Sequence, residues 1–315
     1  MVGKHNTLQS AATVGLLTVF VGLFVACTPF RGKAPIPTRE PLTLILMITN
    51  DTRGYLEEPC GCGIPEGGVA RRATRLKFER QQAAHMMVLD AGDSLIGDSD
   101  PALKTLGATS VEALNRLGYD AITLGPLDLV IGAERLRARI QEAKFAVVAA
   151  NVRLADGGGY LAQPYVIRAV GGHQVALIGL APQAEGKGLV ITAPLATLRE
   201  IMTEVTSQAD IVIVLSHAGV EVDRAIAAQV PDVDVVVTGE ASAPLDLWRK
   251  EDGGVPILHA DVALPGHAGR NLGKAVLQFD AEGRLTDIQW SRTTLGPQIP
   301  SDPAMLEWVR SLTQE

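Results

Sequence analysis

The sequence predicts an α/β fold, and three observations lead to that prediction. Short apolar runs, most of them rich in β-branched residues, recur along the chain and have the length of buried strands. Amphipathic stretches of helical length separate most of these runs. The composition, 47% hydrophobic and 20% charged over 315 residues, suits a globular protein with a large core. Strands that alternate with helices are typical of α/β proteins.

The expected elements follow one another in a single order. Strands are expected at 42–48, 86–90, 121–124, 146–150, 174–180, 210–215, 233–237, 256–260 and 274–279. Helices are expected at 69–82, 101–117, 133–143, 195–207, 220–229 and 303–312. The last third is richer in strands and has an expected hairpin turn at 280–283. We therefore expect one domain, residues 41–315.

The first 26 residues indicate an export signal rather than part of the fold. The run 11–26 is apolar and uncharged, but it is short for a membrane-spanning helix and ends in small residues. Phe24-Val25-Ala26-Cys27 is similar to a bacterial lipobox, in which the cysteine is lipidated. An uncleaved N-terminal anchor is the alternative. The proline-rich segment 27–40 is expected to be an extended tether.

Both interpretations of the N-terminus place the rest of the chain outside the cytoplasmic membrane. We therefore expect a protein of the bacterial cell envelope, attached to the membrane and facing the periplasm. Thr28 after the lipidated cysteine favours the outer membrane in a Gram-negative host. The net charge of −7 and the aromatic content of 4% argue against a nucleic-acid partner, which needs basic surfaces or stacking rings.

Two further cysteines, Cys60 and Cys62, lie in the segment Pro-Cys-Gly-Cys-Gly. The envelope permits disulfides, so the pair could form a small strained ring, hold a soft metal or stay reduced. The sequence leaves these three states open. A redox or soft-metal-binding protein is accordingly one function hypothesis.

Thr49-Asn50-Asp51-Thr52-Arg53-Gly54 follows the first expected strand. An aspartate at a strand end, followed by a glycine-containing loop, is a common place for chemistry in α/β proteins. The segment resembles the motif Thr-Asn-Asp-x-His-Gly of the 5′-nucleotidase branch of the calcineurin-like metallophosphoesterases, whose Asp and His bind metal. Arg53 occupies the position of that histidine, and an arginine cannot ligate a metal.

Five stretches in all resemble this family, in the same order and at similar spacing. They are Asn50–Gly54 with Gly67–Thr74, Asp90–Ser94, Tyr119–Asp128, Leu215–Gly219 and Thr238–Ser242. The resemblance implies two packed mixed β-sheets flanked by helices, a four-layer sandwich. It covers the family's catalytic domain, and we expect no counterpart of the family's C-terminal nucleobase-binding domain.

The resemblance also implies where a metal would bind. Asp51, the bridging Asp93 and His217 take ligand positions, and Glu240 stands where the family has a ligating histidine. A second family histidine is replaced by Ser242, and the family's Asn-His pair by Pro126 and Leu127. Asp128 keeps an acidic position and, with Arg53, is a candidate catalytic residue.

These replacements lead us to expect one divalent ion, zinc, manganese or iron, rather than two, with a metal-free site as an open alternative. In either case the Arg53 guanidinium is expected to pair with Asp51 and to approach Asp93. A structural salt bridge is the simpler interpretation of the Asp51–Arg53 pair.

The primary function hypothesis is a lipid-anchored family member with weak or no phosphohydrolase activity. It would bind a phosphate-containing small molecule or an envelope protein. The alternative is an active one-metal phosphoester hydrolase, with the metal on Asp93, His217 and Glu240 and with Arg53 binding phosphate.

Overall fold

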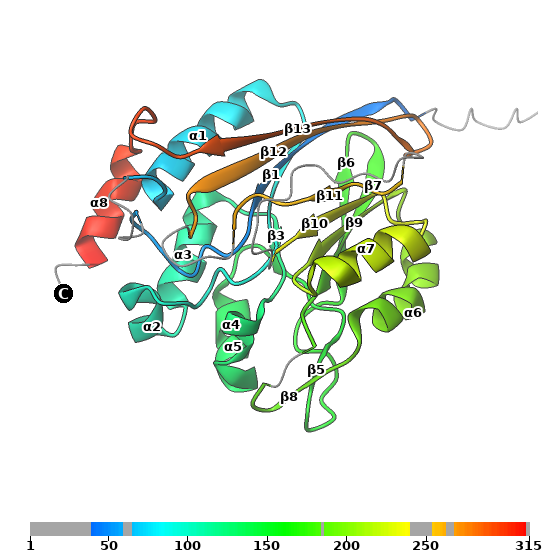
Figure 1. Cartoon of the computed structure of the whole chain (residues 1–315), viewed down its shortest axis with the longest axis horizontal. Coiled ribbons are helices and arrows are strands. Elements are labelled where there is room, and N and C mark those ends of the chain that lie inside the picture. Colours follow the sequence, from blue (N-terminus) through cyan, green and yellow to red (C-terminus); the bar gives the residue numbers. More distant parts are fainter. Residues whose placement is uncertain (1–38, 59–64, 184–185, 240–253, 263–267, 313–315) are drawn as a thin grey trace, which may run out of the picture. The chain divides into compact units, whose positions relative to one another are not determined.

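The computed structural model describes residues 39–58, 65–183, 186–239, 254–262 and 268–312 (Figure 1). Residues Arg39–Glu315 form one compact unit. The predictions for Cys27, Cys60, Cys62, Glu240 and Ser242, and for the signal and tether segments up to residue 38, fall outside the described residues. Within the part described, no helix has both the length and the apolar character needed to cross a membrane.

The first sheet has six strands in the order β13-β12-β1-β2-β3-β4. Their bounds are β1 (Leu42–Thr49), β2 (Met86–Asp90), β3 (Ala121–Ile122), β4 (Ala146–Val147), β12 (Asn271–Phe279) and β13 (Leu285–Thr294). Strands β1 to β4 are parallel, whereas β12 is antiparallel to both β1 and β13. The parallel register pairs Thr49 with Asp90, so the loops after β1 and β2 leave the sheet side by side.

The second sheet has five strands in the order β11-β10-β9-β7-β6. Their bounds are β6 (Tyr165–Val170), β7 (His173–Leu180), β9 (Ile211–Ser216), β10 (Val235–Thr238) and β11 (Ile257–Leu258). All are parallel except β6, which pairs antiparallel with β7. A small antiparallel pair, β5 (Val152–Leu154) and β8 (Leu189–Ile191), lies apart from both sheets (Figure 1).

Three apolar clusters show how the layers pack. One joins the first sheet to helices α1 (Val69–Gln82), α3 (Ala108–Leu117), α5 (Gly132–Glu142) and α8 (Pro303–Leu312). A second lies between the two sheets, and a third joins the second sheet to α6 (Pro194–Thr206) and α7 (Val220–Gln229). Strand β1 serves two clusters, since Leu44 and Leu46 face the second sheet while Met47 faces the helices. The predicted four-layer sandwich of mixed sheets is confirmed.

Some element boundaries differ from those predicted. The prediction of one helix at 101–117 was wrong, because two helices, α2 (Asp100–Thr105) and α3, occupy this stretch. Leu106 and Gly107 between them have φ values of 49° and 86°, and this left-handed pair of residues ends one helix and redirects the chain. Strands β5, β6 and β8 and the short helix α4 (Pro126–Leu129) were not predicted.

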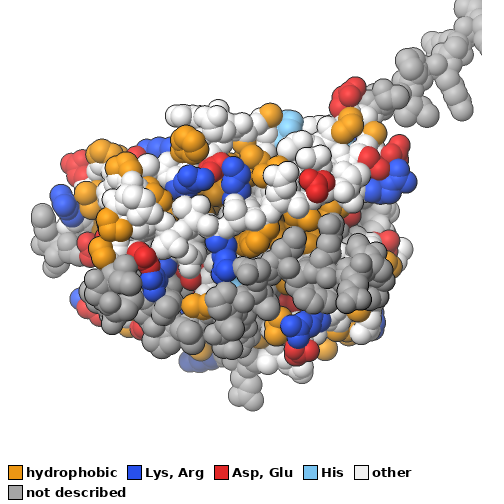
Figure 2. All heavy atoms as spheres, turned by 45° about the horizontal axis from the view of Figure 1, so that its top comes forward, with side chains coloured by type: hydrophobic (Ala, Val, Ile, Leu, Met, Phe, Trp, Pro, Cys, Tyr) orange, Lys and Arg blue, Asp and Glu red, His pale blue; other side chains and the backbone are white. Residues whose placement is uncertain are grey.

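Figure 2 shows one face of the molecule, on which basic and acidic side chains are interspersed. Hydrophobic side chains are scattered between them. Among the described residues, this face has no broad patch of a single charge sign. The motifs that resemble the family lie at the carboxyl ends of the parallel strands.

Candidate metal site

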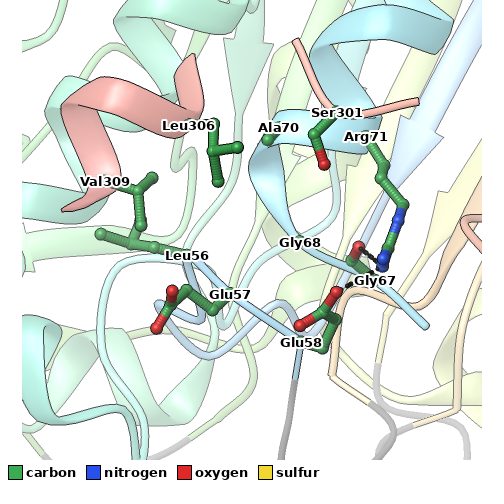
Figure 3. A pocket seen from close by; sticks show the side chains of 10 residues that line it. All are labelled: Leu56, Glu57, Glu58, Gly67, Gly68, Ala70, Arg71, Ser301, Leu306 and Val309. Atoms are coloured by element: carbon green, nitrogen blue, oxygen red, sulfur yellow. Dashed lines mark hydrogen bonds and ion pairs between the residues drawn. The ribbon is translucent and has the colours of Figure 1, made fainter. Parts of the chain in front are cut away.

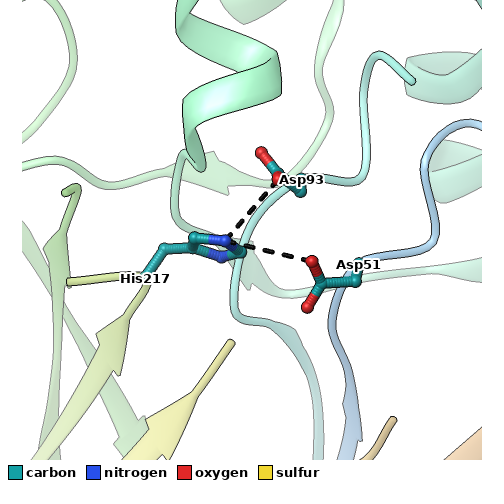
Figure 4. Close-up of side chains that lie close together, drawn as sticks. All are labelled: Asp51, Asp93 and His217. Atoms are coloured by element: carbon teal, nitrogen blue, oxygen red, sulfur yellow. Dashed lines mark ion pairs between the residues drawn. The ribbon is translucent and has the colours of Figure 1, made fainter. Parts of the chain in front are cut away.

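Three buried side chains meet at the carboxyl ends of β1, β2 and β9. Asp51, Asp93 and His217 each offer a ligand atom, and these atoms all lie within 4.8 Å of one another (Figure 4). The Nε2 atom of His217 is 3.6 Å from Asp93 Oδ2 and 4.0 Å from Asp51 Oδ1. The three residues are at most 4% exposed. Two carboxylates and an imidazole are a donor set typical of zinc, manganese or iron sites.

The two aspartates are placed by unusual backbone conformations. Asp51 and Asp93 have φ values of 49° and 55°, in the left-handed region that residues other than glycine rarely adopt. The Asp51 amide donates to Gly92 O at 2.9 Å, and the Arg53 amide donates to Asp93 O at 2.8 Å. These bonds tie the two loops to each other. Backbone strain that is held by surrounding contacts is characteristic of functional sites.

Asp128 organises the loop that carries Asp93. Its Oδ2 accepts hydrogen bonds from the amides of Asp93 (2.9 Å) and Gly125 (3.0 Å). Its Oδ1 accepts from the amides of Leu95 (2.9 Å) and Ile96 (3.3 Å). Both oxygens of this fully buried carboxylate therefore serve the backbone, which gives Asp128 a structural task. The catalytic role suggested by the sequence stays a prediction.

The titration of the site reflects its burial. The pKa of Asp93 is raised to about 7, first by burial and then by the nearby Asp128 and Asp51 carboxylates, against the opposing effect of His217. Burial likewise raises the pKa of Asp128. Burial disfavours the charged form of His217, but the carboxylates of Asp93 and Asp51 outweigh it and raise the pKa of the imidazole.

The orientation of His217 fits a metal ligand. Its Nδ1–H donates to Ala91 O at 2.6 Å, which fixes the ring and leaves Nε2 directed at the two carboxylates. Nε2 is buried and has no hydrogen-bond partner among the described residues. Such an atom calls for an explanation, because buried polar groups are nearly always satisfied. A backbone carbonyl on one ring nitrogen and a cation on the other is the usual arrangement of a metal-binding histidine.

Glycines allow the ligands to approach closely. A Cβ atom on Gly239 would lie 2.3 Å from His217 Nδ1, and one on Gly125 would lie 2.1 Å from Asp93 Oδ1. Real Cβ atoms do not approach other atoms so closely, so neither position accepts a side chain without moving a ligand.

Asn50 and His259 support Asp51 and were not assigned from the sequence. Asn50 Nδ2 donates to Asp51 Oδ2 at 2.6 Å, and Asn50 Oδ1 accepts from the Asp261 amide at 3.0 Å. His259 Nε2 lies 3.3 Å from Asn50 Nδ2. His259 is fully buried, and burial lowers its pKa to about 4. The signal in the sequence that could have identified His259 is its position directly after the short buried strand β11.

Asp223 supports the other side of the site and was also missed. The hydroxyls of Ser216 and Thr238 both donate to this fully buried carboxylate, from Ser216 at 2.5 Å. Ser216 directly precedes His217, and Thr238 directly precedes Gly239. Asp223 therefore fixes the ends of β9 and β10 relative to each other. No motif in the sequence indicated this contact, which joins α7 to two strands.

The remaining predicted residues are placed as follows. Arg53 is half-buried in the loop after Asp51, with Gly97 packed against its Cβ. Leu127 donates its amide to Asp93 Oδ1 at 2.8 Å, at the start of α4. The structure places His217 beside both aspartates, and the pairing of the Arg53 guanidinium with Asp51 stays a prediction.

A pocket between the loop after β1 and helix α8 is a weaker candidate (Figure 3). Its volume is about 50 Å³, far below that of typical small-molecule sites. Arg71 spans it, paired with Glu58 at 2.7 Å and donating to Gly67 O at 3.2 Å. We therefore assign this pocket no ligand.

Comparison with known proteins agrees with the geometry. No protein-family model matches the chain. The 5′-nucleotidase of Bos taurus is 30% identical over 298 residues, which cover 85% of this chain and 52% of that protein. The 5′-nucleotidase of Homo sapiens is 29% identical over 305 residues, covering 87% and 53%. The chain spans about half the length of these curated relatives.

Solved structures show the same relationship. The 5′-nucleotidase precursor from Thermus thermophilus matches with a TM-score of 0.76 and 27% identity, over 87% of this chain and 59% of that one. The calcineurin-like phosphoesterase YfkN from Bacillus subtilis shares the fold, with a TM-score of 0.72 and 20% identity, over 87% and 97%. On this evidence the chain belongs to the 5′-nucleotidase branch of the calcineurin-like metallophosphoesterases.

Proposed function

We propose that this protein binds one divalent cation on Asp51, Asp93 and His217 and uses the site to bind a phosphate-containing small molecule, with weak or no hydrolysis. The observation that carries the proposal is the convergence of three buried ligand atoms, one of them the unsatisfied Nε2 of His217. The cation would be zinc, manganese or iron, which accept carboxylate and imidazole ligands together.

The number of ligands supports one cation rather than two. Among the described residues, one cluster of three ligating side chains is found at this edge of the sheets. Pro126 and Leu127 offer no side-chain ligand where the family has Asn and His. Arg53 adds a fixed positive charge two residues after Asp51, and a second cation nearby would be repelled.

The same residues suggest how a phosphate ligand would be held. A bound cation polarises a phosphoryl oxygen and stabilises its charge. Arg53 would add planar, bidentate recognition of the remaining oxygens. The Leu127 and Asp128 contacts keep the Asp93 carboxylate in place, and Ala91 O keeps the His217 proton on Nδ1.

Hydrolysis is expected to be slow because no imidazole is available at position 127 to protonate the leaving group. The loss of one positioned acid or base commonly lowers a rate by about 10²–10⁴-fold. The alternative is an active one-cation phosphoester hydrolase, for which the sequence suggested Asp93, His217 and Glu240 as ligands. It shares Asp93 and His217 with the main proposal and differs from it in turnover.

Elemental analysis of the purified protein beside Asp93→Ala, with parallel assays on 4-nitrophenyl phosphate and bis(4-nitrophenyl) phosphate, tests the proposal. We expect one equivalent of metal in the wild type, none in Asp93→Ala, and little hydrolysis in either. A clear hydrolytic rate that Asp93→Ala abolishes would establish the active alternative. A wild type without bound metal, and without affinity for added Mn²⁺, would refute the metal site itself.

We also propose that the protein is held at the cell envelope through lipidation of Cys27, because the segment before Cys27 is similar to a lipobox. Arg39 pairs with Asp210 near the amino-terminal end of β1, the opposite end from Asp51. Cell fractionation of wild type and Cys27→Ala tests the proposed lipidation; an unchanged membrane fraction would contradict it.

A further inference from the structure

Arg72 on α1 is a buried cation. Its side chain is 1% exposed. It donates from Nη1 to Tyr119 Oη at 3.3 Å and from Nη2 to Gly269 O at 3.4 Å, while its Nε has no hydrogen-bond partner in the part of the chain that the structure describes. Among the residues that the structure describes, no carboxylate forms an ion pair with this guanidinium. A buried charge in this state is costly unless a compensating charge lies within reach.

The other buried charge of α1 shows the usual solution. Glu79 is also 1% exposed, but it contacts Arg75 at 2.5 Å and Lys274 at 2.7 Å. Arg72 differs because its direct acceptors are the Tyr119 hydroxyl and the Gly269 carbonyl rather than a carboxylate. We therefore expect the negative charge that compensates Arg72 to be reached through the hydrogen bonds that start at the Tyr119 hydroxyl.

The contacts form a continuous chain. Tyr119 Oη lies 2.8 Å from Thr49 Oγ1, and Thr49 Oγ1 donates to Asp90 Oδ2 at 2.6 Å. Asp90 is fully buried. Starting from Arg72, each group donates to the next one, and the carboxylate of Asp90 is the final acceptor. Hydrogen bonds that follow one another in this way strengthen one another in a low-dielectric interior.

Asp90 is joined to the candidate metal site by its other contacts. Its Oδ1 accepts from the Gly92 amide at 2.9 Å, and its Oδ2 also accepts from Ser94 Oγ at 2.7 Å. These two bonds hold the residues on either side of Asp93. Ala91 directly follows Asp90, and its carbonyl oxygen is the group that orients His217. The conformation of Asp90 thus affects two of the three proposed ligands.

We propose that Arg72 and Asp90 form a buried charge pair, joined through the hydroxyls of Tyr119 and Thr49, and that this pair positions the segment carrying Asp93. The positioning role rests on the proposed function, whereas the charge pair does not. Arg72 and Asp90 are positioning residues, since neither touches the proposed cation.

The conditions of the test follow from the surroundings of Asp90. Its pKa is raised to about 7, mainly by burial with a contribution from the Asp128 charge, although hydrogen bonds from the hydroxyls of Thr49 and Ser94 and from the Gly92 amide oppose this rise. Measurements at about pH 8.5 therefore keep Asp90 ionised. At that pH the removal of Arg72 leaves a buried anion uncompensated, and the removal of Asp90 leaves a buried cation.

The experiment is a double-mutant cycle of Arg72→Met and Asp90→Asn, with Mn²⁺ affinity and melting temperature as readouts. We expect each single variant to bind Mn²⁺ at least about tenfold more weakly and to melt earlier than the wild type. The double variant should bind no more weakly than the worse single variant and should regain part of the melting temperature, because both charges leave together.

Two further variants separate the charge pair from general damage. Tyr119→Phe keeps both charges and removes the connecting hydroxyl, so a smaller loss of affinity, about threefold, is expected. It also keeps the proposal testable if Arg72→Met does not fold. Arg80→Met is the matched control on the same helix, since the Arg80 guanidinium donates to Leu117 O and Gly118 O at 2.7 Å. Its Mn²⁺ affinity should be unchanged.

The outcomes are distinguishable. Additive losses of melting temperature in the double variant would overturn the charge pair. Wild-type Mn²⁺ affinity in all three variants, Arg72→Met, Asp90→Asn and Tyr119→Phe, would overturn the positioning role alone. If the wild type itself bound no Mn²⁺, the proposed function would fail, and the melting temperatures would still decide whether Arg72 and Asp90 are paired.

Discussion

The two sheets contribute to the candidate site in different ways. The first sheet supplies Asp51 and Asp93 from loops with left-handed backbone angles, whereas the second supplies His217 directly after β9, without such an angle. The first pair is held by hydrogen bonds from buried polar groups, above all Asn50 and Asp128. The histidine is held by one carbonyl and by close packing at glycine. Hydrogen bonds from side chains therefore reach the aspartates and their loop directly, whereas on the histidine side the Asp223 network holds the strand ends rather than the ligand itself.

The largest expected effect comes from removing a ligand on either side. Asp93→Ala and His217→Ala should each weaken Mn²⁺ binding by more than about 100-fold, because each removes one of three ligands. Isothermal titration measures both, with the exposed Asp156→Ala as a control. If only one of the two variants lost Mn²⁺ affinity, Asp93 and His217 would not be ligands of the same ion.

The supporting carboxylates should differ in their effect on stability. Asp128→Asn places an NH₂ group against backbone amide donors and should lower the free energy of unfolding by about 1–3 kcal/mol. Asp223→Asn should cost less than about 1 kcal/mol, because the hydroxyls of Ser216 and Thr238 can accept as well as donate. Urea denaturation of the metal-free protein compares them; an equal or reversed order would contradict this difference.

Added methyl groups test the packing on each side. Gly239→Ala should displace His217, and Gly125→Ala should displace Asp93, each lowering Mn²⁺ affinity by about tenfold. Titration of both variants measures the effect. Gly157→Ala is the control, since nothing lies within 4 Å of its added Cβ, although its φ of 79° carries a backbone cost of its own. Unchanged Mn²⁺ affinity in Gly239→Ala would show that the second sheet accommodates the added methyl group without displacing His217.

The smallest expected effect is a pH dependence. Burial raises the pKa of Asp93 to about 7, so below that pH a proton competes with the cation. Affinity should therefore increase with pH: Asp93 alone accounts for about fivefold from pH 6 to pH 7, and the raised pKa of His217 adds to the increase. Titrations in buffers of equal ionic strength measure this profile. An affinity that falls with rising pH would contradict the role of Asp93 as a ligand.

The sequence predicted the parts of the fold that depend on local pattern. The continuous apolar run at 42–48 marks β1, and the amphipathic stretch at 303–312 marks α8, because burial on one or two faces leaves a periodic signal. The break at Leu106 and Gly107 was missed because apolar periodicity continues through it. A single left-handed turn leaves little trace in composition.

The candidate site was predictable only where resemblance named its residues. Asp51, Asp93 and His217 matched motif positions, and the structure brings them together. The hydrogen bonds of Asp223, and those that lead from Arg72 through Tyr119 and Thr49 to Asp90, join different elements of the fold, and no periodicity or spacing encodes such contacts. Buried charges of this kind become visible only when burial and partners are known.

One divalent cation between Asp51, Asp93 and His217 is the basis of the function proposed for this protein. Anomalous X-ray scattering from crystals grown with Mn²⁺ locates such an ion directly. We expect a single anomalous peak at this site, within about 2.0–2.3 Å of His217 Nε2 and of an oxygen of each aspartate. Two peaks at the site, or none, would contradict the proposal.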